Sequence, residues 1–217
     1  NFATQTDTRV GSARHLLFEW RHALRLDPRD LEISAFWQRN RYDRRGPFND
    51  PALLPLLHLT QSEDGRITRA GITFCADQLD LTPAEVAGVA TFYSMFRRTE
   101  TGEYLVGVCT NTLCAVMGGD EILRALTEHL GLAPGETTRD GRITVEHVEC
   151  NAACDFAPVV MVNWEFFDNQ TPESAIELIE DLRAGVPTTP PRGTGTVCSF
   201  RATARLLAGL AQDGDQS

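Results

Sequence analysis

The sequence predicts an α/β fold in which a small helical bundle precedes a layer of strands and helices. Residues 51–96 carry leucines and small residues at helical spacing between capping and breaking signals. From Tyr104 onwards, short apolar runs alternate with amphipathic helical patterns, and two of these runs end in cysteine pairs. The predicted organisation is an N-terminal extension over 1–50, a helical region over 51–98, an α/β domain over 99–185 and a C-terminal tail over 186–217.

Composition narrows the class of protein. A chain of 217 residues can bury one core with appendages or two small cores. Its net charge of -10 argues against nucleic acid and anionic lipid as partners. The longest apolar stretch, 156–162, is too short to cross a bilayer, and no secretory signal opens the sequence. We therefore expect no direct membrane insertion and a reducing compartment, where clustered cysteines are more often metal ligands or catalytic groups than disulfides.

The N-terminal part is predicted to be helical. The extension over 1–50 has apolar residues at roughly helical spacing and a run of arginines, which fits one or two helices facing either a partner or solvent. In the helical region, a leucine-rich helix is broken by residues 62–65, and Thr68 caps a second helix that runs to about Leu79. Thr82-Pro83-Ala84-Glu85 forms a capping box for a third. Because the chain is acidic, three short helices indicate a packing module rather than a DNA reader.

The α/β domain is built from short elements. In chain order the predicted elements are a strand over 104–108, a helix from 119 to 130, a strand from 143 to 147, a strand over 159–162, a hairpin partner over 165–167 and a helix from 171 to 185. Strand, helix, strand, strand, helix is a reduced α/β layer of the thioredoxin type. The tail after 185 has too little pattern for a domain of its own.

Four cysteines form two chelating pairs in this domain. Cys109 and Cys114 are spaced C-x4-C, and Cys150 and Cys154 are spaced C-x3-C. Each pair directly follows a predicted strand, so if the two strands are neighbours both loops emerge at the same edge of the sheet. Four thiolates from two loops are the ligand set of a 2Fe–2S cluster.

The surroundings of the two pairs predict how such a cluster would be stabilised. Neither loop contains Lys, Arg or His. Backbone amides over 110–113 and 151–153, and the helix N-terminus near Gly118, are therefore expected to stabilise the negative charge of the cluster. Without nearby cations we expect a low reduction potential, about −400 mV, as in plant-type ferredoxins.

Other sites fit the cysteines less well. A structural zinc site also uses four cysteines, but usually with C-x2-C spacing, and it remains an alternative. A redox dithiol needs C-x-x-C and Rieske ligation needs two histidines at ligand spacing, and the sequence has neither. Cys75 is predicted to be a small buried hydrophobe and Cys198 to be structural. No glycine-rich nucleotide loop follows a strand, so FMN and NADH, if involved, must sit on another chain.

Several segments together resemble one family, the thioredoxin-like 2Fe–2S ferredoxins, and specifically those that form the E subunit of respiratory NADH:quinone oxidoreductase (complex I). The resemblance covers roughly residues 50–185. At 151–153, where the family usually has Leu-Gly-Ala, this chain has Asn-Ala-Ala, so a positive φ at Ala152 would be costly. The segments that carry the resemblance are 81–86, 88–96, 108–114, 135–138, 149–154 and 157–159.

The resemblance implies an electron-transfer subunit with one 2Fe–2S cluster on Cys109, Cys114, Cys150 and Cys154. It also implies a tightly bound partner subunit that carries FMN and oxidises NADH, together with other peripheral-arm subunits. The resemblance further implies that the protein is a peripheral part of a membrane-bound complex, on the cytoplasmic side of the inner membrane. NAD-linked hydrogenases and formate dehydrogenases use subunits of the same family, so they remain alternatives. The extension and the tail are expected to contact neighbouring chains.

Overall fold

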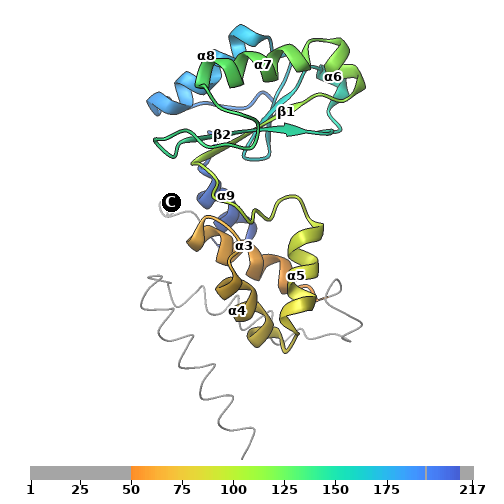
Figure 1. Cartoon of the computed structure of the whole chain (residues 1–217), viewed down its shortest axis with the longest axis vertical. Helices are drawn as coiled ribbons and strands as arrows, with labels where there is room; N and C mark the ends of the chain where they lie inside the picture. The colour runs from red at the N-terminus through yellow and green to blue at the C-terminus, as the bar shows by residue number, and fades with distance from the viewer. Residues whose placement is uncertain (1–49, 194, 211–217) are drawn as a thin grey trace, which may run out of the picture. The chain divides into compact units, whose positions relative to one another are not determined.

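The computed structural model describes residues 50–193 and 195–210, so the predicted helices of the N-terminal extension lie outside the described residues. The described residues form two compact units, coloured along the chain in Figure 1. The helical unit contains residues 50–99 and 204–210, and the α/β unit contains residues 100–203. No helix in the described ranges is both long and apolar enough to span a bilayer.

Residues 50–99 of the helical unit form the helices α3 (Leu53–Asp64), α4 (Arg69–Leu79) and α5 (Pro83–Phe92). The predicted starts of α4 and α5 are confirmed. The Thr68 hydroxyl accepts the Gly71 N–H at 3.0 Å, and Thr82 and Glu85 form the reciprocal capping box. The first helix runs further than expected, because residues 62–64 continue it and Gly65 ends it in the left-handed conformation.

A buried amide fixes the chain that leaves the helical unit. Gln61, on α3, is fully buried; its Nε2 donates to the Met95 carbonyl at 3.0 Å and its Oε1 accepts the Arg97 N–H at 2.7 Å. Both polar ends are therefore satisfied, as a buried amide requires. Cys75 lies in α4 within the same apolar core, and burial raises its pKa to about 12. This confirms the prediction that Cys75 is a buried hydrophobe.

The α/β unit has a four-stranded mixed sheet in the order β2-β1-β3-β4. Its strands are β1 (Tyr104–Cys109), β2 (Ile143–Val148), β3 (Val160–Val162) and β4 (Glu165–Phe167). Strands β1 and β2 are parallel, with Cys109 opposite Val148, and β3 and β4 are antiparallel additions on the other side of β1. The chain segments that follow β1 and β2 therefore leave the same end of the sheet.

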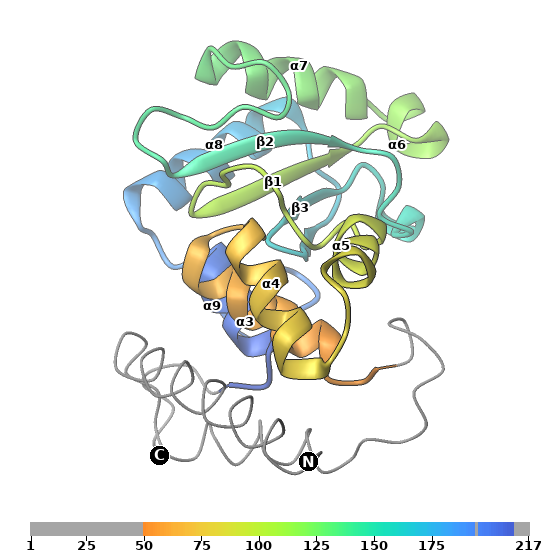
Figure 2. The ribbon, with the colours of Figure 1, turned by 60° about the horizontal axis from the view of Figure 1, so that its bottom comes forward.

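Helices α7 (Gly119–Leu130) and α8 (Pro172–Ala184) cover one face of this sheet, as Figures 1 and 2 show. Their apolar sides pack against the strand side chains that point toward them, and together these form one continuous core. Apolar residues recur at every second position in the strands and at every third or fourth position in the helices, so they all face this core. The main members of this core are Val106, Val108, Ile122, Leu126, Ile143, Val145, Val160, Val162, Ile179 and Leu182.

The tail supplies part of the opposite face, which the sequence did not predict. Phe200 begins α9 (Phe200–Leu207), is buried against Leu105 and Met161, and stacks on Trp164 with ring centroids 5.5 Å apart. Its N–H donates to the Glu103 carbonyl at 2.7 Å. The described tail residues up to 203 thus pack on the α/β unit of their own chain.

Asn163 joins the tail to the sheet. It sits in the two-residue turn between β3 and β4 with a φ of 47°, a conformation that Asn tolerates better than most residues. Its buried side chain accepts the Leu105 N–H at 2.8 Å and donates to the Cys198 carbonyl at 2.8 Å. One amide therefore holds the start of β1 and the tail on the same turn.

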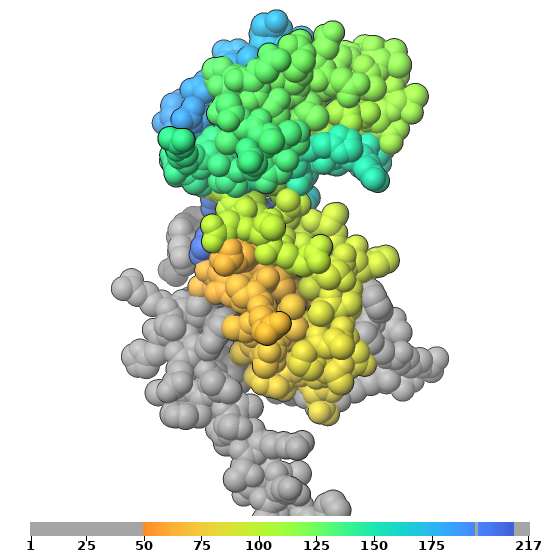
Figure 3. Space-filling view, in the orientation of Figure 1, coloured from red at the N-terminus to blue at the C-terminus, as the bar shows by residue number. Residues whose placement is uncertain are grey.

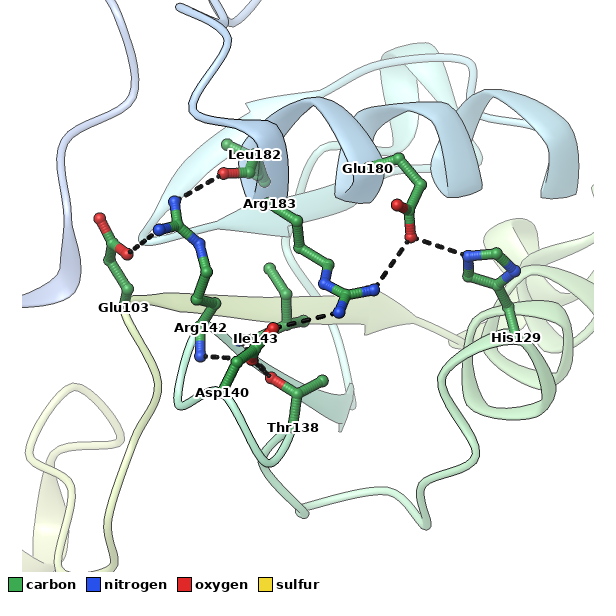
Figure 4. A network of polar contacts seen from close by, with 9 residues as sticks. All are labelled: Glu103, His129, Thr138, Asp140, Arg142, Ile143, Glu180, Leu182 and Arg183. Atoms are coloured by element: carbon green, nitrogen blue, oxygen red, sulfur yellow. Dashed lines mark hydrogen bonds and ion pairs between the residues drawn. The ribbon is translucent and has the colours of Figure 1, made fainter.

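A polar network joins α7 and α8 to the turn before β2, at the end of the sheet opposite the cysteines (Figure 4). Arg183 bridges Asp140 at 3.1 Å and Glu180 at 3.3 Å, and His129 contacts Glu180 at 2.9 Å. Asp140 also accepts the Thr138 hydroxyl and the Arg142 N–H. Hydrogen bonds from Thr138 and Arg142, and then Arg183, lower the pKa of Asp140 from 3.8 to about 2.

This pKa predicts a pH-dependent stability. A lowered carboxyl pKa contributes stability that is present above pH 3.8 and is lost as the pH falls toward 2. Because the Asp140 side chain is 38% exposed, solvent screening limits the contribution to about 1 kcal/mol. Asp140→Asn is therefore expected to lower the free energy of unfolding by that amount at pH 7, with the difference closing toward pH 2 in urea titrations. Glu177→Gln, an exposed carboxylate change on α8, is the control and should be nearly neutral.

Candidate metal centre

The first cysteine of the predicted site ends the central strand. Cys109 is the last residue of β1, and its N–H donates to the Val159 carbonyl at 3.3 Å. The next residue, Thr110, donates its N–H to the Val148 carbonyl at 3.3 Å, so the backbone here is held from both neighbouring segments. Cys109 is therefore placed by the sheet itself and is buried.

A short helix that the sequence analysis missed carries the second cysteine. Helix α6 (Thr112–Val116) begins at Asn111, whose Oδ1 accepts the Thr112 N–H at 2.7 Å, an Asx-type start that could have been read from the sequence. This single turn folds Cys114 back onto Cys109, and both pack against Ala157. The C-x4-C spacing thus packs two buried cysteine side chains together.

Gly119 lets this arrangement close. A Cβ at Gly119, the first residue of α7, would lie 2.5 Å from the Cys109 carbonyl oxygen and 2.9 Å from that of Cys114. Only glycine allows the start of α7 to approach both cysteine-bearing backbones so closely. The predicted helix start near Gly118 is confirmed. The close approach of α7 to the two cysteine backbones explains why residue 119 is also a glycine.

The second pair lies on the loop after β2. Cys150 and Cys154 are exposed, and Cys154 begins a single 3₁₀ turn, η2 (Cys154–Phe156). Ala152 has a φ of 51°, so this position does adopt the positive φ expected to be costly for alanine. Its N–H points at the Cys150 sulfur, at 3.3 Å. Figure 2 places α6 and this loop at the same end of the sheet, and in Figure 3 both reach the surface on one side of the unit.

The structure brings some of the predicted ligands together. Burial raises the pKa of the Cys114 thiol, and the neighbouring Cys109 and Cys154 raise it further, so Cys114 lies near one cysteine of each pair. Across residues 50–193 and 195–210, no three His, Cys, Asp or Glu side chains converge closely enough to hold a metal ion. The donor chemistry, four thiols on two loops at one sheet end, still fits a 2Fe–2S cluster.

The backbone amides follow the expectation only in part. The Ala152 N–H does point at a sulfur, as predicted for the 151–153 segment. In the other loop, the Thr110 and Thr112 N–H groups donate to the Val148 carbonyl and to Asn111. These two amides are used by the fold, so the first loop offers fewer donors to a cluster than its sequence indicated.

A cationic side chain that sequence reasoning missed lies beside the second pair. Arg192, in the tail, contacts Asp155 at 2.9 Å and Asp168 at 2.8 Å, and its guanidinium carbon lies 5.0 Å from the centre of the Phe156 ring. Asp155 directly follows Cys154. The expectation that no cation is near the cysteines therefore holds within the loops but not for the folded chain, because the tail returns to this site.

Apolar side chains around the two loops face solvent. Phe156 lies two residues after Cys154, and the others lie in or beside α6. Large apolar residues that stay exposed together are typical of surfaces that bind another protein. They are Leu113, Val116, Met117 and Phe156.

Comparison with known proteins decides the family. A model of the thioredoxin-like 2Fe-2S ferredoxin family matches residues 40–183 of the chain. The chain belongs to this family. The resemblance drawn from residues 50–185 is thereby confirmed, and with it the thioredoxin-like α/β fold.

Relatives of this ferredoxin include subunits of respiratory enzymes. The E subunit of the NADH-quinone oxidoreductase of Mycobacterium tuberculosis is 64% identical over 181 residues, which cover 83% of this chain and 69% of the relative. NADH-quinone oxidoreductase subunit 2 of Thermus thermophilus is 42% identical over 135 residues, covering 62% of this chain and 75% of the relative. Among solved structures, an NAD+-reducing NiFe hydrogenase in the H2-reduced state aligns with a TM-score of 0.56 at 25% identity, covering 63% of this chain and 23% of that one.

Proposed function

We propose that this chain is the electron-transfer subunit of an NADH:quinone oxidoreductase and holds one 2Fe–2S cluster on Cys109, Cys114, Cys150 and Cys154. The observation that carries the proposal is that both cysteine loops leave the same end of the parallel β1–β2 pair, in a chain of the 2Fe-2S ferredoxin family. When bound, such a cluster supplies one-electron transfer, here with a flavin.

The chain's own residues have distinct parts in this proposal. The buried Cys109 and Cys114 provide a rigid half of the site, set by β1 and by the approach of α7 at Gly119. The exposed Cys150 and Cys154 provide a half that can be reached from outside. The exposed apolar residues beside both halves would bind a partner subunit and keep water from the path of the electron.

That partner is the subunit that carries FMN and NADH. The relatives' names support a multisubunit enzyme, and a site so near the surface suits transfer to a cofactor on another chain. With other peripheral-arm subunits, the complex would place this chain peripherally on the cytoplasmic side of the inner membrane. A same-family subunit of an NAD-linked hydrogenase is the second candidate, favoured by the fold match to the NAD+-reducing hydrogenase.

The test of the cluster is spectroscopic. The full chain, purified without oxygen and reduced with dithionite, is expected to give the rhombic EPR signal of a 2Fe–2S cluster, with two irons and no stoichiometric zinc. Zinc at one ion per chain without an EPR signal would contradict the proposal in favour of a structural zinc module. Isolation of the tagged chain from its host then identifies the complex: bound FMN with NADH:quinone activity supports complex I, and hydrogen-dependent NAD+ reduction supports the hydrogenase.

A further inference from the structure

The tail presents Arg192 from a tight turn. The Gly193 N–H donates to the Pro190 carbonyl at 3.1 Å, which closes a four-residue turn around Pro191 and Arg192. Proline at the second position and glycine at the fourth are the residues that such turns favour. A Cβ at Gly193 would lie 2.6 Å from the Pro190 ring, so the turn is closely folded. The backbone of Arg192 is therefore already restricted by the turn, so little conformational entropy is lost when its side chain binds.

The guanidinium of Arg192 binds three side chains at once. Its Nε lies 2.9 Å from each oxygen of Asp168, and its Nη2 lies 2.9 Å from an Asp155 oxygen. The face of the group lies over the Phe156 ring. Forked, charge-assisted contacts of this kind are among the strongest that a surface arginine makes. Two of the three partners, Asp155 and Phe156, belong to the η2 turn that begins with Cys154.

The third partner, Asp168, is the one that the fold holds in place. Asp168 follows β4 directly, and its side chain is only 9% exposed, whereas that of Asp155 is 58% exposed. The Asn169 N–H also donates to the Phe156 carbonyl at 2.9 Å. Arg192 therefore ties an exposed turn to a nearly buried carboxylate at the end of a strand, and the Cys154 turn is held from the sheet side and from the tail side.

We propose that Arg192 is a positioning residue that holds the Cys154 turn in place and, with Asp155 and Asp168, sets part of the reduction potential at this site. The part that concerns the potential rests on the proposed function, whereas the positioning part does not. Arg192 lies beyond residue 183, where the match to the family model ends. The three charged groups sum to −1 beside Cys154, and changing any one of them changes the local charge.

The test compares charge and geometry in the full chain. Arg192→Gln removes the charge and the fork, Arg192→Lys keeps the charge without the fork, and Asp168→Asn removes one negative charge. Arg183→Gln is the matched control, since Arg183 also bridges two carboxylates but at the opposite end of the sheet. The readouts are amide hydrogen exchange over residues 154–157 in the metal-free chain and the EPR-monitored midpoint potential of the loaded chain.

We expect exchange over 154–157 to rise about tenfold in Arg192→Gln, and by less in Arg192→Lys, with no change there in Arg183→Gln. The potential should fall in Arg192→Gln and rise in Asp168→Asn, because added negative charge disfavours reduction. Unchanged exchange in both Arg192 variants would overturn the positioning role, and shifts of the same sign in Arg192→Gln and Asp168→Asn would overturn the role in the potential. If the chain holds zinc instead, the proposed function fails. The hydrogen-exchange comparison still tests whether Arg192 positions the Cys154 turn.

Discussion

Cys109→Ser and Cys154→Ser are each expected to weaken or abolish the 2Fe–2S EPR signal, whereas Cys75→Ser and Cys198→Ser should leave it unchanged. A cluster needs thiolate ligands, and serine is a poor replacement for a thiolate toward iron. Cys75 cannot serve as a ligand, because it lies in the apolar core of the helical unit and burial raises its pKa to about 12. The measurement is EPR of the anaerobically reduced full chain together with its iron content.

These four variants compare one assigned ligand from each cysteine pair with two cysteines outside the site. Circular dichroism of each variant shows whether a lost signal comes from a lost ligand or from unfolding. Loss of the signal in a folded Cys75→Ser chain, or an unchanged signal in Cys109→Ser, would show that the assigned ligands are wrong. Cys198 is a matched comparison for Cys154, since it is also a cysteine of the α/β unit that lies outside the core.

Gly119→Ala is expected to cost about 2–3 kcal/mol of unfolding free energy and to lower the iron content. The added methyl group would lie 2.5 Å from one backbone oxygen and 2.9 Å from another, and backbone atoms cannot move aside as a flexible side chain can. Those oxygens belong to Cys109 and Cys114, so any relief of the clash displaces the two buried sulfurs. Urea unfolding and iron analysis of the purified chain provide the measurement.

Gly88→Ala is the control for Gly119→Ala. Gly88 lies within α5, and a Cβ there would meet nothing within 4 Å. The substitution should therefore stabilise the chain by about 0.5–1 kcal/mol through helix propensity, with no effect on iron content. Equal stability and iron content in Gly119→Ala and the unmodified chain would contradict the packing argument.

Features of the fold that depend on residues close together in the chain could be predicted from the sequence. The capping box at Thr82 and the glycine that ends α7 at 131 depend on residues a few positions apart, and the structure has both. The sequence predicted both strands and left their pairing as a condition; the structure meets it, because β1 and β2 are parallel neighbours and the cysteine loops leave one end of the sheet.

What the sequence did not reveal is either too short to show a pattern or depends on distant contacts. Helix α6 is a single turn, too short for a periodic pattern. Phe200 and Arg192 lie in a tail of weak periodicity, and their partners are more than 20 residues away in the chain. The cation beside Cys154 was missed for this reason, since a search of the loops could not include a residue that only folding brings there.

The contacts of Asn163 and Phe200 bear on where this ferredoxin ends as a folding unit. The family pattern stops at residue 183, yet the Cys198 carbonyl satisfies the buried Asn163 amide and Phe200 covers Leu105 and Met161. A chain cut at the family boundary would leave apolar surface of the sheet open to water and an amide short of a partner. The match to the family model ends at residue 183, whereas the closed core of the α/β unit includes Phe200, 17 residues further along the chain.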